Sequence, residues 1–149
     1  MADINSFASR WTPYLLSVLR IVAGFLILQH GMQKVFGFPP PAQPPPAGPL
    51  PWYVPVSGWL ELIGGFLLLI GLFTRLTAFI MSGLLAVAYF MAHAPQGFWP
   101  ILNRGELAAL YSFVFLYLAA AGGGPWSVDA CLPGRRGGDA AASDAARGY

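Results

Sequence analysis

Four long apolar runs, separated by shorter polar or proline-rich segments, make up most of the chain. Each run is close to the roughly 20 residues with which an α-helix crosses about 30 Å of hydrocarbon. Pro13 suits the first turn of a helix, where its missing N–H has no partner to lose. The pattern predicts an all-α integral membrane protein, a bundle of four transmembrane helices over residues 13–36, 54–73, 75–93 and 102–121.

The segments between the runs predict loops. Residues 38–52 are dense in proline and carry no charge, which forbids a helix and favours an extended polyproline II conformation in an outer loop. Gly122 to Pro125 ends the fourth run, as glycine followed by proline does. We expect a cytoplasmic lead (1–12), a single membrane domain (13–130) and, because its residues are small and polar, a disordered cytoplasmic tail (131–149).

The composition agrees with a membrane protein. Hydrophobic residues make up 56% of the 149 residues and charged residues 9%, against about 25% charged in soluble domains. So short and apolar a chain cannot bury its own surface, so the lipid bilayer is its expected solvent. The small net charge of +2 without a basic cluster argues against nucleic acid as a partner. The single cysteine, Cys131, excludes an internal disulfide and a thiol relay, and with them the disulfide-forming class of four-helix quinone reductases.

The distribution of arginine and lysine predicts the orientation. The side that carries the termini holds more basic residues than the other side, and cytoplasmic loops are the more basic ones. We therefore expect both termini in the cytoplasm. The residues counted are Arg10, Arg75, Arg135 and Arg136 on the terminal side, and Lys34 and Arg104 on the opposite side.

The polar side chains of the runs gather toward the predicted outer side. Charged residues near lipid are costly, so each is a candidate for function. We predict an ion-pair network in which Gly31 lets a neighbouring helix approach until Lys34 reaches Glu61. The candidate ligand site comprises His30 and Lys34 in the first span, Glu61 in the second, His93 ending the third, and Arg104 and Glu106 opening the fourth.

Other interpretations of these residues stay open. Lys34 can snorkel to the headgroups, Glu106 can complement a helix N-terminus, and His93 can be an interfacial residue. Glu61 is harder to explain in this way, because a carboxylate so deep must be neutralised or find a cation. The network could bind an anion or a quinone headgroup, or relay protons. Metal and haem are disfavoured because no Glu-x-x-His motif or other ligand spacing is present.

A second polar cluster lies toward the inner side. Arg20 is about 10 Å into the first span, at 1.5 Å per residue. We expect it to snorkel or to pair with Asp129, for which Arg75 competes. Such ion pairs would be structural and would hold the C-terminal part of the chain against the bundle.

The spaced glycine and polar positions together resemble the DoxX family of small four-helix membrane proteins. The resemblance covers roughly residues 15–130 and implies a bundle in the bacterial inner membrane. Some DoxX-like proteins are subunits of quinone-linked oxidoreductases that act on sulfur compounds, others are similar to members of redox or detoxification assemblies, and distant animal relatives act as receptor-assembly chaperones. The long proline-rich segment departs from the family. The matching positions are Arg20, His30-Gly31-x-x-Lys34-x-x-Gly37, Gly58-x-x-Glu61-x-x-Gly64-Gly65, Gly71-Leu-Phe-Thr-Arg75, His93, Glu106 and Ser127-x-Asp129.

The resemblance constrains the fold more tightly than the function. Our first hypothesis is a non-catalytic or quinone-interacting subunit of a membrane oxidoreductase, with quinone as the candidate cofactor. The chain shows no flavin, thiol or nucleotide motif, so any enzymatic activity would belong to a complex with partner subunits or further copies. One alternative is a scaffold or assembly factor in which the same layer only packs helices. Another is a small transporter or proton pathway.

Overall fold

The computed structural model describes residues 4–41 and 48–132, and it is entirely helical over these residues, without a strand. The first two helices of the chain are α1 (Ile4–Phe36) and α2 (Tyr53–Ile70). Next comes α3 (Thr74–Ala88), which continues through the π-helical turn η1 (Tyr89–His93) into the 3-10 turn η2 (Ala94–Gln96). The remaining helices are α4 (Pro100–Asn103), α5 (Glu106–Ala121) and α6 (Val128–Cys131).

The all-helical membrane class is confirmed, whereas the number of spans is not. Three helices of the described chain are long and apolar enough to cross a membrane, over Phe7–Phe36, Tyr53–Ile70 and Thr74–Gln96. The fourth apolar helix, α5, has 16 residues. It is shorter than the predicted span 102–121 because Arg104 adopts a left-handed backbone (φ 59°) and ends α4 before α5 begins.

Other predicted boundaries differ as well. The prediction that Pro13 opens the first helix is wrong, since α1 begins at Ile4 and contains Pro13 in its interior. The carbonyl of Pro13 accepts a hydrogen bond from the Ser17 hydroxyl at 3.3 Å. Within the predicted outer loop, residues 42–47 lie outside the described residues, and so do residues 133–149 of the predicted tail.

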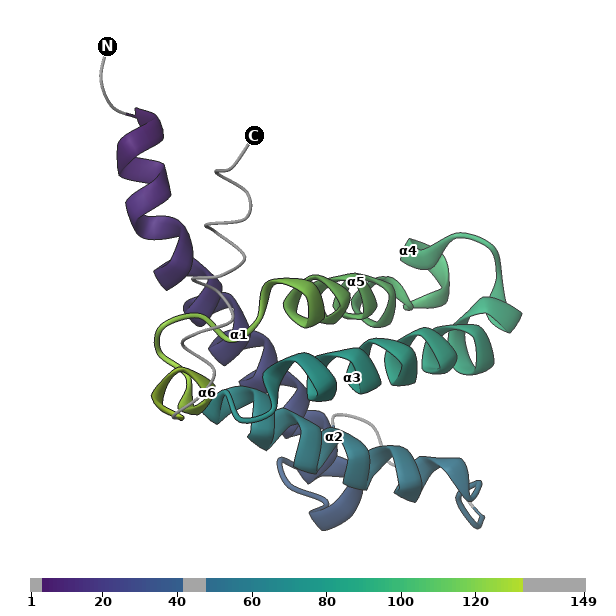
Figure 1. Ribbon diagram of the computed structural model, residues 1–149. Helices are drawn as coiled ribbons and strands as arrows, with labels where there is room; N and C mark the ends of the chain where they lie inside the picture. Colours follow the sequence, from purple (N-terminus) through teal and green to yellow (C-terminus); the bar gives the residue numbers. More distant parts are fainter. Residues whose placement is uncertain (1–3, 42–47, 133–149) are drawn as a thin grey trace.

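The helices form two hairpins, α1 with α2 and α3 with α5 (Figure 1). The hairpins meet where α2 turns into α3, and α6 lies beside this turn, with the Asp129 N–H donating to the Gly71 carbonyl at 2.9 Å. We call this region the terminal end. From it the hairpins diverge, so that the far end of α1 and the α4 region lie apart in Figure 1. We call these two far ends the loop ends.

Glycines bring α1 and α2 into backbone contact. A Cβ atom on Gly24 would lie 2.7 Å from the Leu69 nitrogen, and one on Gly65 would lie 2.6 Å from the Leu28 nitrogen. In lipid, where no hydrophobic force drives helices together, such close van der Waals packing stabilises the pair. We call the four glycines of this contact the glycine seam. The two glycines on each helix are seven residues apart, which places them on the same face of that helix. Its members are Gly24 and Gly31 on α1, and Gly58 and Gly65 on α2.

The buried apolar core joins the hairpins. Met81 of α3 packs against Gly64 of α2, and Tyr111 stacks on Phe115 within α5 with ring centroids 5.7 Å apart. The outward faces carry many exposed large apolar side chains, as lipid-facing helices do. The core residues are Ala23, Ile27, Leu68, Ala78, Met81, Leu85, Phe115 and Leu118.

Candidate functional site

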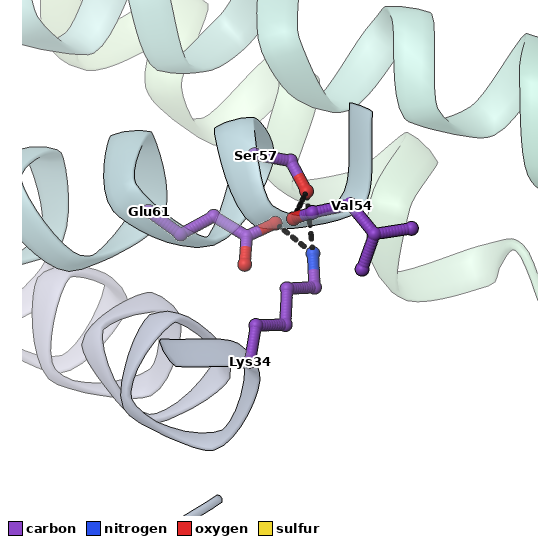
Figure 2. A network of polar contacts seen from close by, with 4 residues as sticks. All are labelled: Lys34, Val54, Ser57 and Glu61. Carbon is purple, nitrogen blue, oxygen red and sulfur yellow. Dashed lines mark hydrogen bonds and ion pairs between the residues drawn. The ribbon is translucent and has the colours of Figure 1, made fainter. Parts of the chain in front are cut away.

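A polar pair closes the loop end of the first hairpin (Figure 2). Lys34 lies in the last turn of α1 and extends toward α2. Its Nζ donates to Glu61 Oε1 at 2.6 Å and to Ser57 Oγ at 3.2 Å. Ser57 and Glu61 are four residues apart on α2 and share a face. The Ser57 hydroxyl in turn donates to the Val54 carbonyl at 2.8 Å, which orients its oxygen toward Lys34.

The two partners differ in exposure. The Glu61 side chain is 4% exposed, while the Lys34 side chain is 32% exposed. Glu61 Oε2 is buried and has no hydrogen-bond partner among the described residues. An ammonium group has three N–H donors, and Lys34 uses two of them here. The pair therefore keeps a donor that surrounding molecules can reach and a buried acceptor that a proton or a ligand donor would stabilise.

Two glycines of the seam place this pair. A Cβ on Gly31 would lie 2.6 Å from the Leu62 Cα and 2.9 Å from the Glu61 carbonyl carbon, so the predicted close approach is present. Gly58 does the same from the other helix, since its Cβ would lie 2.8 Å from the Lys34 Cβ. The separation of the two backbones, and hence the reach of Lys34, depends on both positions.

His30 lies one turn before Lys34 on α1 and is exposed. It borders a small cavity of about 160 Å³ together with Leu26, Gln29, Gln33 and Pro39. The Gln33 amide donates to the Pro39 carbonyl at 3.0 Å and holds the chain after α1 against the helix. Within the described residues no hydrogen bond links His30 to the Lys34–Glu61 pair.

His93 belongs to the other hairpin and organises its tip. Its Nδ1 lies 3.0 Å from the Asn103 carbonyl oxygen. The Asn103 side chain is buried; its Nδ2 donates to the Gly97 carbonyl at 2.7 Å and its Oδ1 accepts from the Gly105 N–H at 2.8 Å. These contacts close the turn between α3 and α5, which gives His93 a local structural role.

Arg104 and Glu106 are exposed on either side of Gly105, where the turn joins α5. In the part of the chain that the structure describes, no hydrogen bond or ion pair joins them, or His93, to Lys34 or Glu61. The structure thus brings Lys34 and Glu61 together and places the other three candidates at the second loop end, apart from the first (Figure 1). A single layer of all six residues stays a prediction.

Sequence reasoning missed two residues that hold the loop ends, Ser57 and Asn103. Ser57 could have been found from its spacing of four to Glu61, which places both on one face of α2. Asn103 is hard to find because the apolar pattern predicts one helix over residues 102–121; the Asn and Gly around Arg104 are the signal that could mark the break. No group of three or more His, Cys, Asp or Glu side chains in the described residues could hold a metal ion.

The terminal end holds Arg20 as a clamp on the backbone. The side chain is fully buried. Its Nε donates to the Gly123 carbonyl at 2.8 Å, and its Nη1 to the carbonyls of Leu68 and Leu69 at 2.6 and 2.8 Å. Its Nη2 donates to the Trp126 carbonyl at 2.5 Å. Arg20 therefore ties α1 to the end of α2 and to the segment that follows α5.

The other two members of the predicted inner cluster also bind backbone groups. Asp129 accepts from the N–H groups of Phe73 and Thr74 at 2.9 and 2.8 Å, so it caps α3 from a distant part of the chain. Arg75 donates to the carbonyls of Ala119 and Ala120 at the end of α5. The cluster fastens the C-terminal segment to the bundle through backbone carbonyl and N–H partners. The predicted ion pairs of Arg20 and Arg75 with Asp129 are wrong for the described residues, because both arginines donate to backbone carbonyls instead.

The helices are apolar and expose large apolar side chains, and three of them are long enough to cross a membrane, so the fold is that of a helical membrane protein. The sequence model of the DoxX family matches residues 15–94, and the chain belongs to that family. A relative from Haemophilus influenzae, described as an uncharacterized protein, is 42% identical over 123 residues, which cover 80% of this chain and 92% of the relative. A second uncharacterized protein of that organism is 30% identical over 127 residues, with 78% and 82% coverage. No solved structure matches the chain.

Proposed function

We propose that this DoxX-family membrane protein is a quinone-interacting, non-catalytic subunit of a membrane oxidoreductase complex. The observation that carries the proposal is the Lys34–Glu61 pair, which offers a reachable N–H donor beside a buried carboxylate. A quinone carbonyl oxygen accepts a hydrogen bond, and Lys34 is placed to donate one. Glu61 compensates the lysine charge, so a neutral headgroup would meet a site without net charge, as a low-dielectric environment requires.

The redox chemistry would lie in a partner. In this role Lys34 binds and orients a headgroup, and Glu61 and Ser57 hold the ammonium in place. The residues 4–41 and 48–132 supply no metal-binding cluster, and the chain has one cysteine. The proposed complex therefore contains a catalytic subunit with its own electron-carrying group. That subunit can bind one copy of this chain or an assembly of several copies.

We infer that α5 is the fourth span of the domain. Its 16 residues rise about 24 Å at 1.5 Å per residue, somewhat less than the hydrocarbon thickness. Its antiparallel pairing with α3 supports this inference (Figure 1). Four spans would put both termini on one side, and the excess of arginine there supports a cytoplasmic location in the bacterial inner membrane. The loop ends would then face outward.

The test is the binding of a short-chain benzoquinone to the purified full chain in detergent, measured by isothermal titration calorimetry. We expect Lys34→Met to weaken binding about tenfold or more, because a hydrogen bond to a charged group contributes about 1.5–3 kcal/mol. Glu61→Gln should weaken binding as well, since Lys34 loses its partner. Arg104→Gln is the matched control at the second loop end and should bind normally. Wild-type affinity in both Lys34→Met and Glu61→Gln would overturn the proposal.

The glycine seam favours a second candidate function, a scaffold that only packs helices and assembles partners. In that case Lys34→Met and Glu61→Gln would leave the activity of the complex intact, while Gly65→Val would abolish assembly because no side chain fits against Leu28. Co-purification of partner subunits and the quinone-dependent activity of the complex, measured on the same three variants, separate the two functions.

A further inference from the structure

One carboxylate oxygen of the Lys34–Glu61 pair is buried without a hydrogen bond. Glu61 Oε1 accepts from Lys34 Nζ at 2.6 Å, whereas Oε2 has no partner among residues 4–41 and 48–132. The whole Glu61 side chain is only 4% exposed. An unpaired buried acceptor is costly in free energy, so Oε2 requires a donor that the described residues do not supply.

Neither polar neighbour of Glu61 is arranged to supply that donor. The Ser57 hydroxyl donates to the Val54 carbonyl at 2.8 Å, so its single hydrogen is already used. Lys34 directs two of its three N–H groups to Glu61 Oε1 and Ser57 Oγ. Its third N–H can serve a surrounding molecule, because the side chain is 32% exposed. The pair thus combines one available donor, on Lys34, with one available acceptor, Glu61 Oε2.

A hydroxyl group matches this combination, and a carbonyl group does not. The oxygen of a hydroxyl accepts from the Lys34 ammonium while its hydrogen donates to Glu61 Oε2. A carbonyl oxygen only accepts, so it would leave Oε2 buried and unpaired. Sites that hydrogen-bond a ligand hydroxyl reject the analogue without it, because the polar group of the site then loses its partner.

Two soft side-chain torsions bring Oε2 within reach of such a hydroxyl. The last torsion of a glutamate is broad, so the carboxylate can turn Oε2 toward the exposed side of Lys34. The lysine itself has a flexible four-carbon stem. In Figure 2 the ammonium of Lys34, on α1, faces the carboxylate of Glu61 and the hydroxyl of Ser57, both on α2. A ligand hydroxyl that approaches Lys34 therefore arrives next to the carboxylate.

We propose that the Lys34–Glu61 pair selects the reduced form of the headgroup, the quinol, over the quinone; this selection rests on the quinone role proposed above. One quinol hydroxyl accepts from Lys34 Nζ and donates to Glu61 Oε2, which makes Glu61 the specificity-determining residue. Quinone and quinol are both neutral, so hydrogen bonding and not charge discriminates between them. Tighter binding of the quinol raises the midpoint potential of the bound two-electron couple, by about 30 mV for a tenfold preference.

The test compares four probes that share one ring. They are a short-chain benzoquinone, its quinol, and the monomethyl and dimethyl ethers of that quinol. Each is titrated under anaerobic conditions into the full chain in detergent, by isothermal titration calorimetry. We expect the quinol to bind about tenfold more tightly than the quinone. The monomethyl ether retains one O–H and should bind like the quinol, whereas the dimethyl ether only accepts and should bind like the quinone.

Two matched substitutions connect the preference to Glu61. Glu61→Gln leaves one amide oxygen for Lys34 and replaces the other oxygen with an NH₂ donor. Quinol binding should therefore weaken more than quinone binding, and the tenfold preference should fall to about one. Glu106→Gln makes the same change at an exposed carboxylate of the second loop end and should preserve the preference.

The outcomes separate this selection from the quinone role itself. Equal affinities of the wild-type chain for quinol and quinone overturn the selection and leave the quinone site standing, since both forms still bind. Absence of binding by all four probes overturns the quinone role and the selection together. A preference that persists in folded Glu61→Gln overturns the assignment to Glu61. If Glu61→Gln fails to fold, the two ethers decide on the wild-type chain, and equal affinities for them overturn the selection.

Discussion

The two ends of the first hairpin bury charge in opposite ways. At the terminal end, Arg20 directs all three guanidinium nitrogens to backbone carbonyls and is fully buried. At the loop end, Lys34 remains partly exposed and Glu61 keeps a buried oxygen without a partner among the described residues. Arg20 uses four of its five N–H donors in this way and holds structure, whereas a pair with a buried oxygen left over retains the capacity to bind. This contrast is why we assign stability to Arg20 and function to the Lys34–Glu61 pair.

The difference follows from the chemistry of the two cations. A guanidinium has five N–H donors in a rigid plane and can serve several carbonyls at once. An ammonium is a compact point charge on a flexible stem, so it pairs locally and can exchange a partner. The last carbonyls of a helix can accept from side chains, and Arg20 donates to those of Leu68 and Leu69 near the end of α2, where the Leu68 carbonyl also accepts from the Gly71 N–H.

The largest expected effect is the loss of the clamp. Arg20→Met should destabilise the protein by at least about 3 kcal/mol, because several buried carbonyls lose a charged donor at once. Thermal unfolding in detergent, followed by circular dichroism, measures this loss. Arg10→Met removes an exposed arginine of the same helix and should change little. If the two variants unfold at the same temperature, the structural half of the comparison fails.

The second-largest loss of stability is expected from a substitution in the glycine seam. Gly65→Ala places a Cβ 2.6 Å from the Leu28 nitrogen and should destabilise the hairpin by about 1–3 kcal/mol, as overpacking does. Gly83→Ala on α3 is the matched control, because its Cβ meets nothing within 4 Å. Alanine is the better helix former, so the control should be neutral or slightly stabilising. Unfolding curves of the two variants decide the point, and equal effects would remove the argument for close packing.

A double-mutant cycle sharpens the functional half of the comparison. Lys34→Met, Glu61→Gln and the double variant should show a coupling free energy of about 0.5–3 kcal/mol, the range for contacting residues. The same cycle between Lys34 and Arg104 should give about zero if the two loop ends are independent. Chemical unfolding in detergent supplies the free energies. Coupling between Lys34 and Arg104 would instead favour the single six-residue layer predicted from the sequence.

The smallest effect is expected at Asp129. Asp129→Asn keeps one acceptor for the N–H groups of Phe73 and Thr74 and replaces the other with a donor. Loss of a helix cap costs about 0.5–2 kcal/mol, so the melting temperature should fall by a few degrees. Ser127→Ala, which removes the local cap of α6, provides a scale for comparison. An unchanged melting temperature of Asp129→Asn would show that this side chain does not hold the C-terminal segment.

The two hairpins also differ in how well the sequence predicted them. In the first hairpin, the pairing of Lys34 with Glu61 and the role of Gly31 followed from polar residues standing alone in apolar runs. In the second, the run over residues 102–121 concealed the break at Arg104, because hydropathy is insensitive to a left-handed residue inside an apolar stretch. His93 and Glu106 were placed at a common depth with Glu61, yet depth along a helix says nothing about lateral distance between hairpins that diverge.

The sequence by itself determined the membrane class, the apolar helices, the family and the polar residues that needed partners. It could do so because the cost of burying backbone and charge in lipid restricts the chain to helices with few charged positions. Tertiary structure alone decided that the arginines of the terminal end bind carbonyls, that Asp129 caps α3, and that the α1–α2 and α3–α5 loop ends lie apart. The first two outcomes depend on backbone groups, which every residue carries, so side-chain patterns do not specify them. The third depends on the angle at which the two hairpins pack, which hydropathy along the chain does not encode.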